Sequence, residues 1–167
     1  MKKYIKNGFT LVELIIVIAV IGFIGGVLLV QLKPNLILQK GRDSKRLQEI
    51  TTLQKAINLA LTEGEITLTS NGTSCTSCSS TTGTSLVNGS GYVKFTIPSG
   101  KTGLSNYIST LPIDPSNTGN YVYKFGSTLS DFELNLVFEH PDNATIMSTD
   151  GGNSSAIYEI GSKLDIL

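Results

Sequence analysis

The residue with the most unusual chemical setting in this sequence is a single carboxylate inside a long apolar stretch. Residues 9–32 are apolar except for Thr10, Glu13 and Gln31, and residues 14–30 contain no polar side chain. A carboxylate near the centre of a membrane helix costs about 2.5–3.5 kcal/mol, so such a residue usually has a function. We therefore expect Glu13 to find a positively charged partner in the working protein.

The apolar stretch is long enough to span a membrane as a helix. It has 24 residues, and about 20 helical residues cross the bilayer core. Lys2, Lys3 and Lys6 precede it. A cleaved secretory signal has a shorter apolar core followed by a small-residue cleavage site, which does not occur here. A plain membrane anchor explains the length of the stretch, but it leaves Glu13 without a partner.

The residues that lead into the stretch have a specific pattern. Residues 8–13, Gly-Phe-Thr-Leu-Val-Glu, resemble the processing motif of type IV pilins and of the pseudopilins of type II secretion, a class III signal peptide. The resemblance implies that prepilin peptidase removes the basic leader 1–8 by cutting between Gly8 and Phe9, and that Phe9 becomes N-methylated. It also implies that Glu13 pairs with the new amine of a neighbouring subunit, where a desolvated ion pair fixes register.

The helix is expected to continue beyond the membrane as an amphipathic segment, residues 33–64, and Gly64 is a suitable stop. Apolar residues spaced by three and four form a stripe that should pack on a globular head; they are Leu47, Ile50, Leu53, Ile57 and Leu61. Two interpretations stay open for the opposite, mainly basic side: a solvated surface, or a contact with acidic lipid headgroups or neighbouring subunits. Its members are Arg42, Lys45, Arg46, Gln48, Glu49 and Lys55.

Two features weaken the helix, and both are candidates for a role in assembly. Gly22, Gly25 and Gly26 each lower helix propensity by about 1 kcal/mol relative to Ala, and Gly22 and Gly26 have the small-xxx-small spacing of close helix contacts. They serve either local extension in the filament, as the resemblance implies, or simple packing. Pro34 predicts a kink near Lys33 because it removes a backbone donor and disfavours helix at the preceding residue. The family usually has this proline one turn earlier.

Residues 67–85 are a compositional outlier, since thirteen of the nineteen are Ser or Thr and none is charged. With their flank they predict a polar loop over 67–90 rather than a packed element. Cys75 and Cys78 lie inside it and are the chain's two cysteines. A structural zinc site needs four ligands, which two cysteines and one histidine do not supply. The exported location implied by the resemblance favours a short disulfide, with free thiols as the alternative.

After this loop, polar and apolar residues alternate in a way that is typical of half-buried strands. The alternation predicts strands at 92–97, 121–125 and 132–139, a turn at 126–130, and a further short piece at 156–160. The expected fold is therefore α+β: a long N-terminal helix packed on a head, residues 65–167, with a small antiparallel sheet. This is the type IV pilin-like architecture that the resemblance implies.

Two loops of the head also resemble those of major pseudopilins. Residues 111–115, Leu-Pro-Ile-Asp-Pro, resemble the loop before the sheet, and we expect Asp114 to be a turn carboxylate. Asp150 begins a late Asp-Gly loop that holds calcium in several members, and Asn153 and Asp142 could add the oxygen ligands that calcium prefers. The acidic cluster that follows in those relatives is missing, so a simple turn is preferred and calcium stays the alternative. No other cofactor is expected.

The composition disfavours catalysis and nucleic-acid binding. The 13 basic and 13 acidic residues balance, without the basic excess of nucleic-acid binders. His140 is the lone histidine and is expected in a surface loop, and the sequence shows no catalytic triad or phosphate loop. We therefore expect that the protein is not an enzyme. Residues 33–55, which we call the neck, have six basic and two acidic residues, and residues 56–167 have four basic and ten acidic residues. This distribution predicts salt-sensitive contacts between the neck of one subunit and the head of another.

Together these features predict a structural subunit of a type IV pilus or pilus-like surface filament. Residues 9–32 would anchor the precursor in the inner (cytoplasmic) membrane, where it meets lipid, prepilin peptidase and the assembly machinery. Mature copies would then form a helical homo-oligomer outside the cell. Two alternatives stay open: the major pseudopilin of a type II secretion system, and a minor pilin that acts as a surface binding module.

Overall fold

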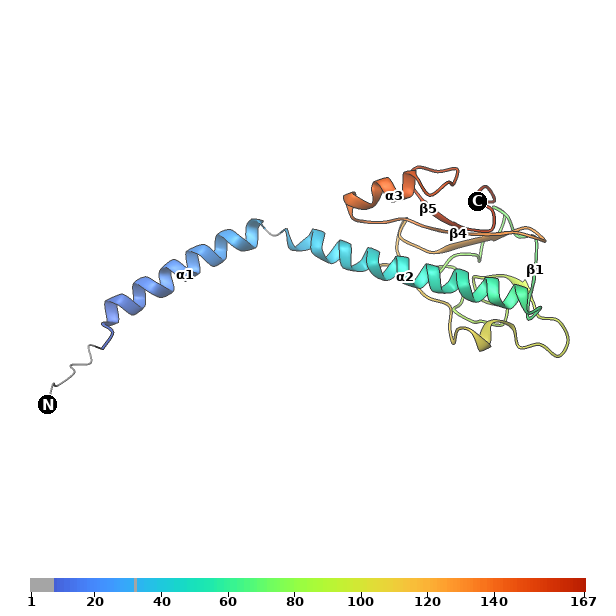
Figure 1. The fold of residues 1–167 in the computed structure, drawn as a ribbon, viewed down its shortest axis with the longest axis horizontal. Helices are drawn as coiled ribbons and strands as arrows, with labels where there is room; N and C mark the ends of the chain where they lie inside the picture. The colour runs from blue at the N-terminus through green and yellow to red at the C-terminus, as the bar shows by residue number, and fades with distance from the viewer. Residues whose placement is uncertain (1–7, 32) are drawn as a thin grey trace. The chain divides into compact units, whose positions relative to one another are not determined.

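The computed structural model describes residues 8–31 and 33–167 (Figure 1). The chain forms two compact units, Met1–Leu38 and Gln39–Leu167. The basic residues of the predicted leader, Lys2, Lys3 and Lys6, lie outside the described residues.

Two helices follow one another in the first part of the chain. α1 spans Leu11–Gln31 and runs without interruption through its three glycines. α2 spans Pro34–Thr62, and Lys33 before it has a φ of 42°. The expected continuous helix is therefore broken, because the residue before a proline is disfavoured in the α region whereas proline itself suits a first helical turn. Pro34 begins a second helix instead of kinking one helix.

The end of α2 is a glycine stop, as the sequence predicts. Gly64 has a φ of 64°, in the left-handed region that glycine adopts without a Cβ penalty. Glu65 N donates to Ala60 O at 2.8 Å, and Gly64 N donates to Leu61 O at 3.1 Å. These bonds satisfy carbonyls at the helix end and turn the chain into the head.

The head contains two small antiparallel sheets. β1 (Thr67–Leu68) pairs with β2 (Phe95–Thr96). The second sheet has the order β3-β4-β5 and consists of β3 (Lys124–Ser127), β4 (Phe132–Leu136) and β5 (Tyr158–Gly161). The remaining elements are a short helix and two 3-10 turns: α3 (Ala144–Ser148), η1 (Gly103–Asn106) and η2 (Pro141–Asn143). The predicted α+β class is confirmed.

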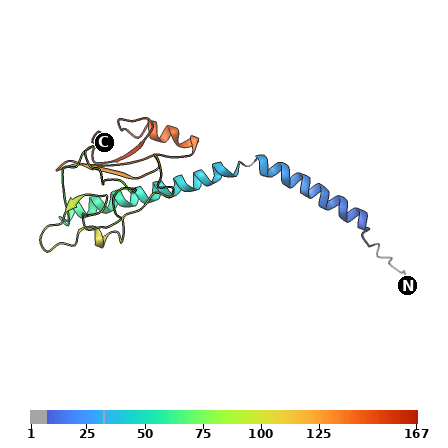
Figure 2. The same cartoon turned by 180° about the vertical axis from the view of Figure 1, so that it is seen from behind.

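α2 supplies one side of the core of the head. In both views it lies between the three-stranded sheet and the segment around η1 (Figures 1 and 2). Its fully buried apolar residues are Ile50, Leu53, Ile57 and Ala60. They belong to one cluster with Phe125 and Phe132 of the sheet. The stripe differs from the prediction at its ends, because Leu47 is 39% exposed and Ala60, not Leu61, is buried.

The predicted strands overlap the observed ones but have wrong boundaries. The observed strands are Phe95–Thr96, Lys124–Ser127, Phe132–Leu136 and Tyr158–Gly161. Residues 126–127, predicted as a turn, are in β3. The segments before β2 and β3 form local bonds instead of ladders, since Tyr92 N donates to Thr84 O at 2.9 Å and Tyr121 N donates to Thr118 O at 3.0 Å. Alternation alone does not reveal where backbone groups find their partners.

The Ser/Thr-rich segment is packed, contrary to the prediction of a free loop. Phe125 N donates to Cys78 O at 2.9 Å, and Ser80 N donates to Tyr123 O at 2.9 Å. Ser79 and Lys124 form an antiparallel bridge. The segment therefore covers the outer edge of β3, which would otherwise expose unpaired backbone groups. Its polar composition is compatible with this role because the bonds use main-chain atoms.

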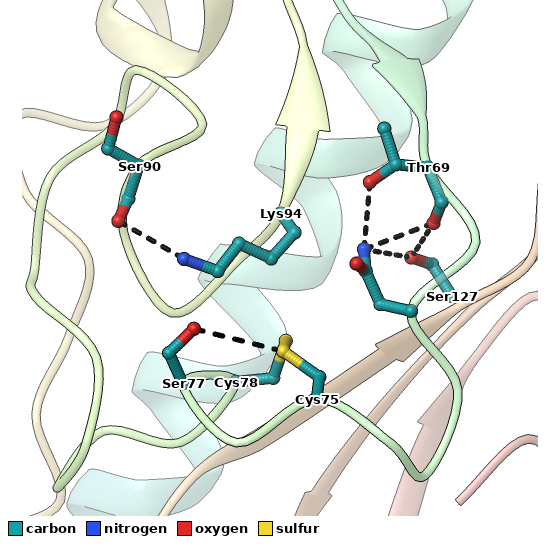
Figure 3. Close-up of a disulfide and its surroundings, with 8 residues drawn as sticks. Thr69, Cys75, Ser77, Cys78, Ser90, Lys94 and Ser127 are labelled. Carbon is teal, nitrogen blue, oxygen red and sulfur yellow. Dashed lines mark hydrogen bonds between the residues drawn. A yellow bond between two sulfur atoms is a disulfide. The ribbon is translucent and has the colours of Figure 1, made fainter.

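Figure 3 shows how side chains hold the same segment. Cys75 and Cys78 form a disulfide with an S–S distance of 1.97 Å. At the start of the segment, Asn71 Nδ2 donates to Thr69 O at 3.1 Å and to Ser127 Oγ at 3.2 Å, and Ser127 Oγ donates to Thr69 O at 2.6 Å (Figure 3). These bonds tie the loop to the end of β3.

Candidate functional site

Glu13 lies in the first turn of α1 and closes a capping box with Thr10. Thr10 N and Thr10 Oγ1 each donate to Glu13 Oε2 at 2.8 Å, and Glu13 N donates to Thr10 Oγ1 at 3.2 Å. This exchange satisfies backbone donors that the start of a helix leaves free. The Thr-x-x-Glu spacing was available in the sequence as a helix-start signal, but the prediction gave Glu13 an ion-pair role alone.

Gly8 and Phe9 precede the capping box without regular secondary structure. Phe9 is 86% exposed, so the bond between the two residues is accessible. A Cβ built on Gly8 would meet no described atom within 4 Å. The fold itself therefore does not require glycine here, and a requirement for it would have to come from whatever acts on this bond.

α1 exposes an apolar surface along its described length. Leu11–Leu28 is the one segment among the described helices that is long and apolar enough to cross a membrane, and none of it is buried. A surface of this kind marks contact with lipid or with other protein. At Gly22 and Gly26 an added Cβ would meet no described atom within 4 Å. No contact within the described chain accounts for these glycines, and their role in helix contacts stays a prediction.

A second polar site ties α2 to the loops of the head. We call it the Arg46 cluster, and it consists of Arg42, Asp43, Arg46, Asp114 and Glu139. Arg46 is 0% exposed. Its Nε donates to Asp114 Oδ2 at 2.6 Å and its Nη2 donates to Asp114 Oδ1 at 2.8 Å, a bidentate pair. Arg46 also donates to Asp43 Oδ1 at 2.8 Å and to Glu139 Oε1 at 2.6 Å.

The carboxylates of this cluster also hold backbone groups. Asp43 accepts from Glu139 N at 2.9 Å and from His140 N at 2.8 Å, which fixes the chain after β4 against α2. Asp114 Oδ1 accepts from Ser116 N at 2.8 Å, so the expected turn role is present together with the ion pair. The His140 side chain is only 10% exposed, so the expectation of a surface histidine is wrong.

The cluster corrects the prediction for the basic side of α2. Arg46 is neither solvated nor available to lipid or other subunits, and Arg42 pairs through Nε and Nη2 with Glu139 of the same chain. Part of the attraction between the basic neck and the acidic head therefore acts within one subunit instead of between subunits. A signal was present in the sequence, because Arg46 lies four residues before Ile50 and so continues the buried stripe of the helix.

Burial and ion pairing act against each other in this cluster. Burial lowers the pKa of Arg46, but the hydrogen bonds that Arg46 donates to Asp114 and Glu139 more than offset this effect, and the net pKa is raised. Hydrogen bonding from Arg42 lowers the pKa of Glu139 to about 2, with Arg46 adding to the effect and burial opposing it. Arg42, Arg46 and Glu139 are therefore charged at neutral pH.

Acid should weaken the head as Glu139 takes up a proton. The pKa of Glu139 is about 2 in the folded chain against an ordinary value of 4.5, so the unfolded chain binds the proton more readily. Its contribution to stability is present above about pH 4.5 and is lost as the pH falls toward 2. Urea midpoints between pH 6 and 2.5 should fall more for the wild type than for Glu139→Gln. An equal fall in both proteins would contradict this assignment.

The residues considered for calcium make other contacts in the structure. Asp150 Oδ1 accepts from Gly152 N at 2.9 Å and Oδ2 accepts from Glu159 N at 2.8 Å, as expected for a turn. Asp142 lies 3.7 Å from Lys40 Nζ, and Asn153 Nδ2 lies 3.5 Å from Leu167 O. The part of the chain described by the structure has no group of three or more His, Cys, Asp or Glu side chains that could hold a metal.

Comparison with known proteins gives a match at the N-terminus. Residues 5–29 match the family model described as the prokaryotic N-terminal methylation motif. The match includes the Gly8–Phe9 bond, the capping box and most of α1. No curated protein and no solved structure matches the chain.

Proposed function

We propose that this protein, which carries the class III signal peptide motif of type IV pilins and pseudopilins, is a structural subunit that polymerises through α1 into a type IV pilus or pilus-like surface filament. The observation that carries the proposal is the exposed apolar helix that the methylation motif includes, with a carboxylate held at its start. A simple anchor would need the helix and could use the capping box, but it would have no use for a charged residue where a neutral Gln also closes such a box.

The motif also bears on processing and location. It implies cleavage by prepilin peptidase and assembly into a filament, and it points to a structural, non-enzymatic protein. The motif and the apolar helix together fit a precursor anchored in a membrane.

Assembly would exchange one apolar environment for another. The apolar side chains of α1 contact lipid in the precursor and the α1 helices of other copies in the filament, so they never meet water. This exchange costs little hydrophobic free energy in either direction. The filament therefore needs a separate interaction to select one register among many similar apolar contacts.

Glu13 is suited to provide that interaction. The capping box uses Glu13 Oε2 and the backbone N–H of Glu13, which leaves Oε1 for a second partner. Cleavage after Gly8 would create a positive amine on Phe9. The amine of one subunit and Oε1 of the next would form a desolvated pair that fixes register, while the capping box continues to hold the carboxylate.

The test combines electron microscopy of sheared surface material with mass spectrometry of its subunits. We expect filaments whose subunit begins at N-methylated Phe9. An assembled subunit that still carries residues 1–8 would contradict the processing step. Filaments that form only inside the envelope, together with loss of protein export on gene deletion, would favour the pseudopilin alternative.

A further inference from the structure

Two carboxylates and one amide lie together on the outer face of the three-stranded sheet. Phe132, Leu134 and Leu136 of β4 join the core that contains α2, so by strand alternation Glu133 and Asn135 point to the other face. Asn135 is directly opposite Glu159 in β5, and Glu133 is opposite Gly161, one pair further along. The three polar side chains therefore share one face, at cross-strand and diagonal distances that allow contact.

This polar group is buried although it faces away from the core. Glu133 is 0%, Glu159 2% and Asn135 4% exposed. Glu133 Oε2 accepts from Ile166 N at 2.6 Å and from Leu167 N at 3.1 Å, and Glu159 Oε2 accepts from Ser154 N at 3.0 Å. Each carboxylate thus uses one oxygen to hold a covering segment, the C-terminal tail or the loop before β5.

The second oxygen of each carboxylate is left without a donor. Among the described residues, none gives a hydrogen bond to Glu133 Oε1, Glu159 Oε1 or Asn135 Oδ1. Buried oxygens of this kind are costly unless they have a partner. No described salt bridge brings Lys124, the nearest basic residue in the sheet register, to either carboxylate.

A cation satisfies this arrangement better than a proton does. One shared proton would bridge the two carboxylates but would leave Asn135 Oδ1, which also has no donor among the described residues, without a partner. The two carboxylates lie on neighbouring strands and are both buried, so they repel each other as long as nothing positive lies between them. A divalent ion matches the two negative charges and can contact all three oxygens.

Room for water ligands is available beside the group. Asn135 and Glu159 line a cavity of about 300 Å³, together with Asn153 and the C-terminal Leu167. Calcium takes six to eight oxygen ligands in flexible geometry, and sites with few protein ligands complete the shell with water. The cavity provides both the entry path and the space for that water.

We propose that Glu133, Asn135 and Glu159 bind a divalent cation that prefers oxygen ligands, with calcium as the best fit. The ion would neutralise the carboxylate pair and so fasten the C-terminal tail and the loop around Ser154 to the sheet. The site lies on β4 and β5 and does not depend on the filament function proposed above. With three protein oxygens we expect a Kd of about 10⁻⁴–10⁻³ M, the range of extracellular calcium modules.

The test is calcium titration of the full mature chain in non-ionic detergent, by calorimetry and by thermal unfolding. At calcium about ten times the Kd, the folding equilibrium constant should rise about tenfold, which raises Tm by about 3–6 °C for a chain of this size. Glu159→Gln should abolish both the binding heat and the Tm shift. This variant should still fold, because the Gln amide can donate to Glu133 Oε1.

Asp142→Asn is the matched control, since Asp142 is an acidic residue of the head with a side chain 68% exposed and is not part of the group. It should keep the full calcium response. Absence of a calcium effect in the wild type, or a response that survives in Glu159→Gln, would overturn the proposal. Stability that falls as the pH rises, equally with and without calcium, would show a shared proton instead and would also overturn the proposal.

Discussion

Replacing Arg46 with methionine should lower the free energy of unfolding of the head by about 3–5 kcal/mol, the cost of removing one partner from a buried ion cluster. Methionine is long enough to fill most of the space but donates no hydrogen bond. Asp43 and Asp114, which are 2% and 3% exposed, would lose their positive partner without gaining access to water. The measurement is urea unfolding of the full chain in detergent, followed by the near-ultraviolet circular dichroism of the tyrosines.

Lys45→Met is the matched control for this prediction. Lys45 is the preceding residue on α2, its side chain is 59% exposed, and among the described residues its one ion pair is with Glu49 at 3.6 Å. Its substitution should change the free energy of unfolding by less than about 0.5 kcal/mol. If Arg46→Met cost no more than this control, the Arg46 cluster would not be what joins α2 to the head loops.

Replacing Glu13 with glutamine should block filament assembly while leaving the precursor processed. Glutamine can still close the capping box with Thr10, so α1 should begin normally, but it carries no charge for the amine of a neighbouring Phe9. An unpaired amine in an apolar filament core should cost about 3–5 kcal/mol per contact, which shifts the assembly equilibrium by at least about a hundredfold. Immunoblots of the sheared fraction against total cell protein measure this loss.

Thr10→Ala separates capping from charge pairing. This change removes the Thr10 Oγ1 bonds, at 2.8 and 3.2 Å, and keeps the carboxylate. We expect filaments to persist, with a loss of about 1 kcal/mol of helix stability. Mass spectrometry of the membrane fraction should find Phe9 as the N-terminus in both variants. Normal filament yield from Glu13→Gln would show that register does not depend on the charge of this residue.

The sequence alone determined the features that depend on neighbouring residues. The apolar length of α1, the motif at residues 8–13 and the glycine stop at Gly64 were read correctly because each is decided within a few residues along the chain. The interruption at Pro34 has the same local origin, and only its form, a new helix instead of a kink, differed from the prediction. The proposed membrane and assembly roles of this part rest on these local signals.

The tertiary structure decided the features that depend on distant residues. Arg46 and Asp114 are 68 positions apart and Arg46 and Glu139 are 93 apart, so no local pattern could show that they form one buried cluster. The same holds for the strand boundaries, which follow from bonds such as Phe125 N to Cys78 O, and for Glu133, Asn135 and Glu159, which only the register of β4 and β5 brings together. Burial converts such charges from surface residues into ion partners, and burial is a property of the packed chain.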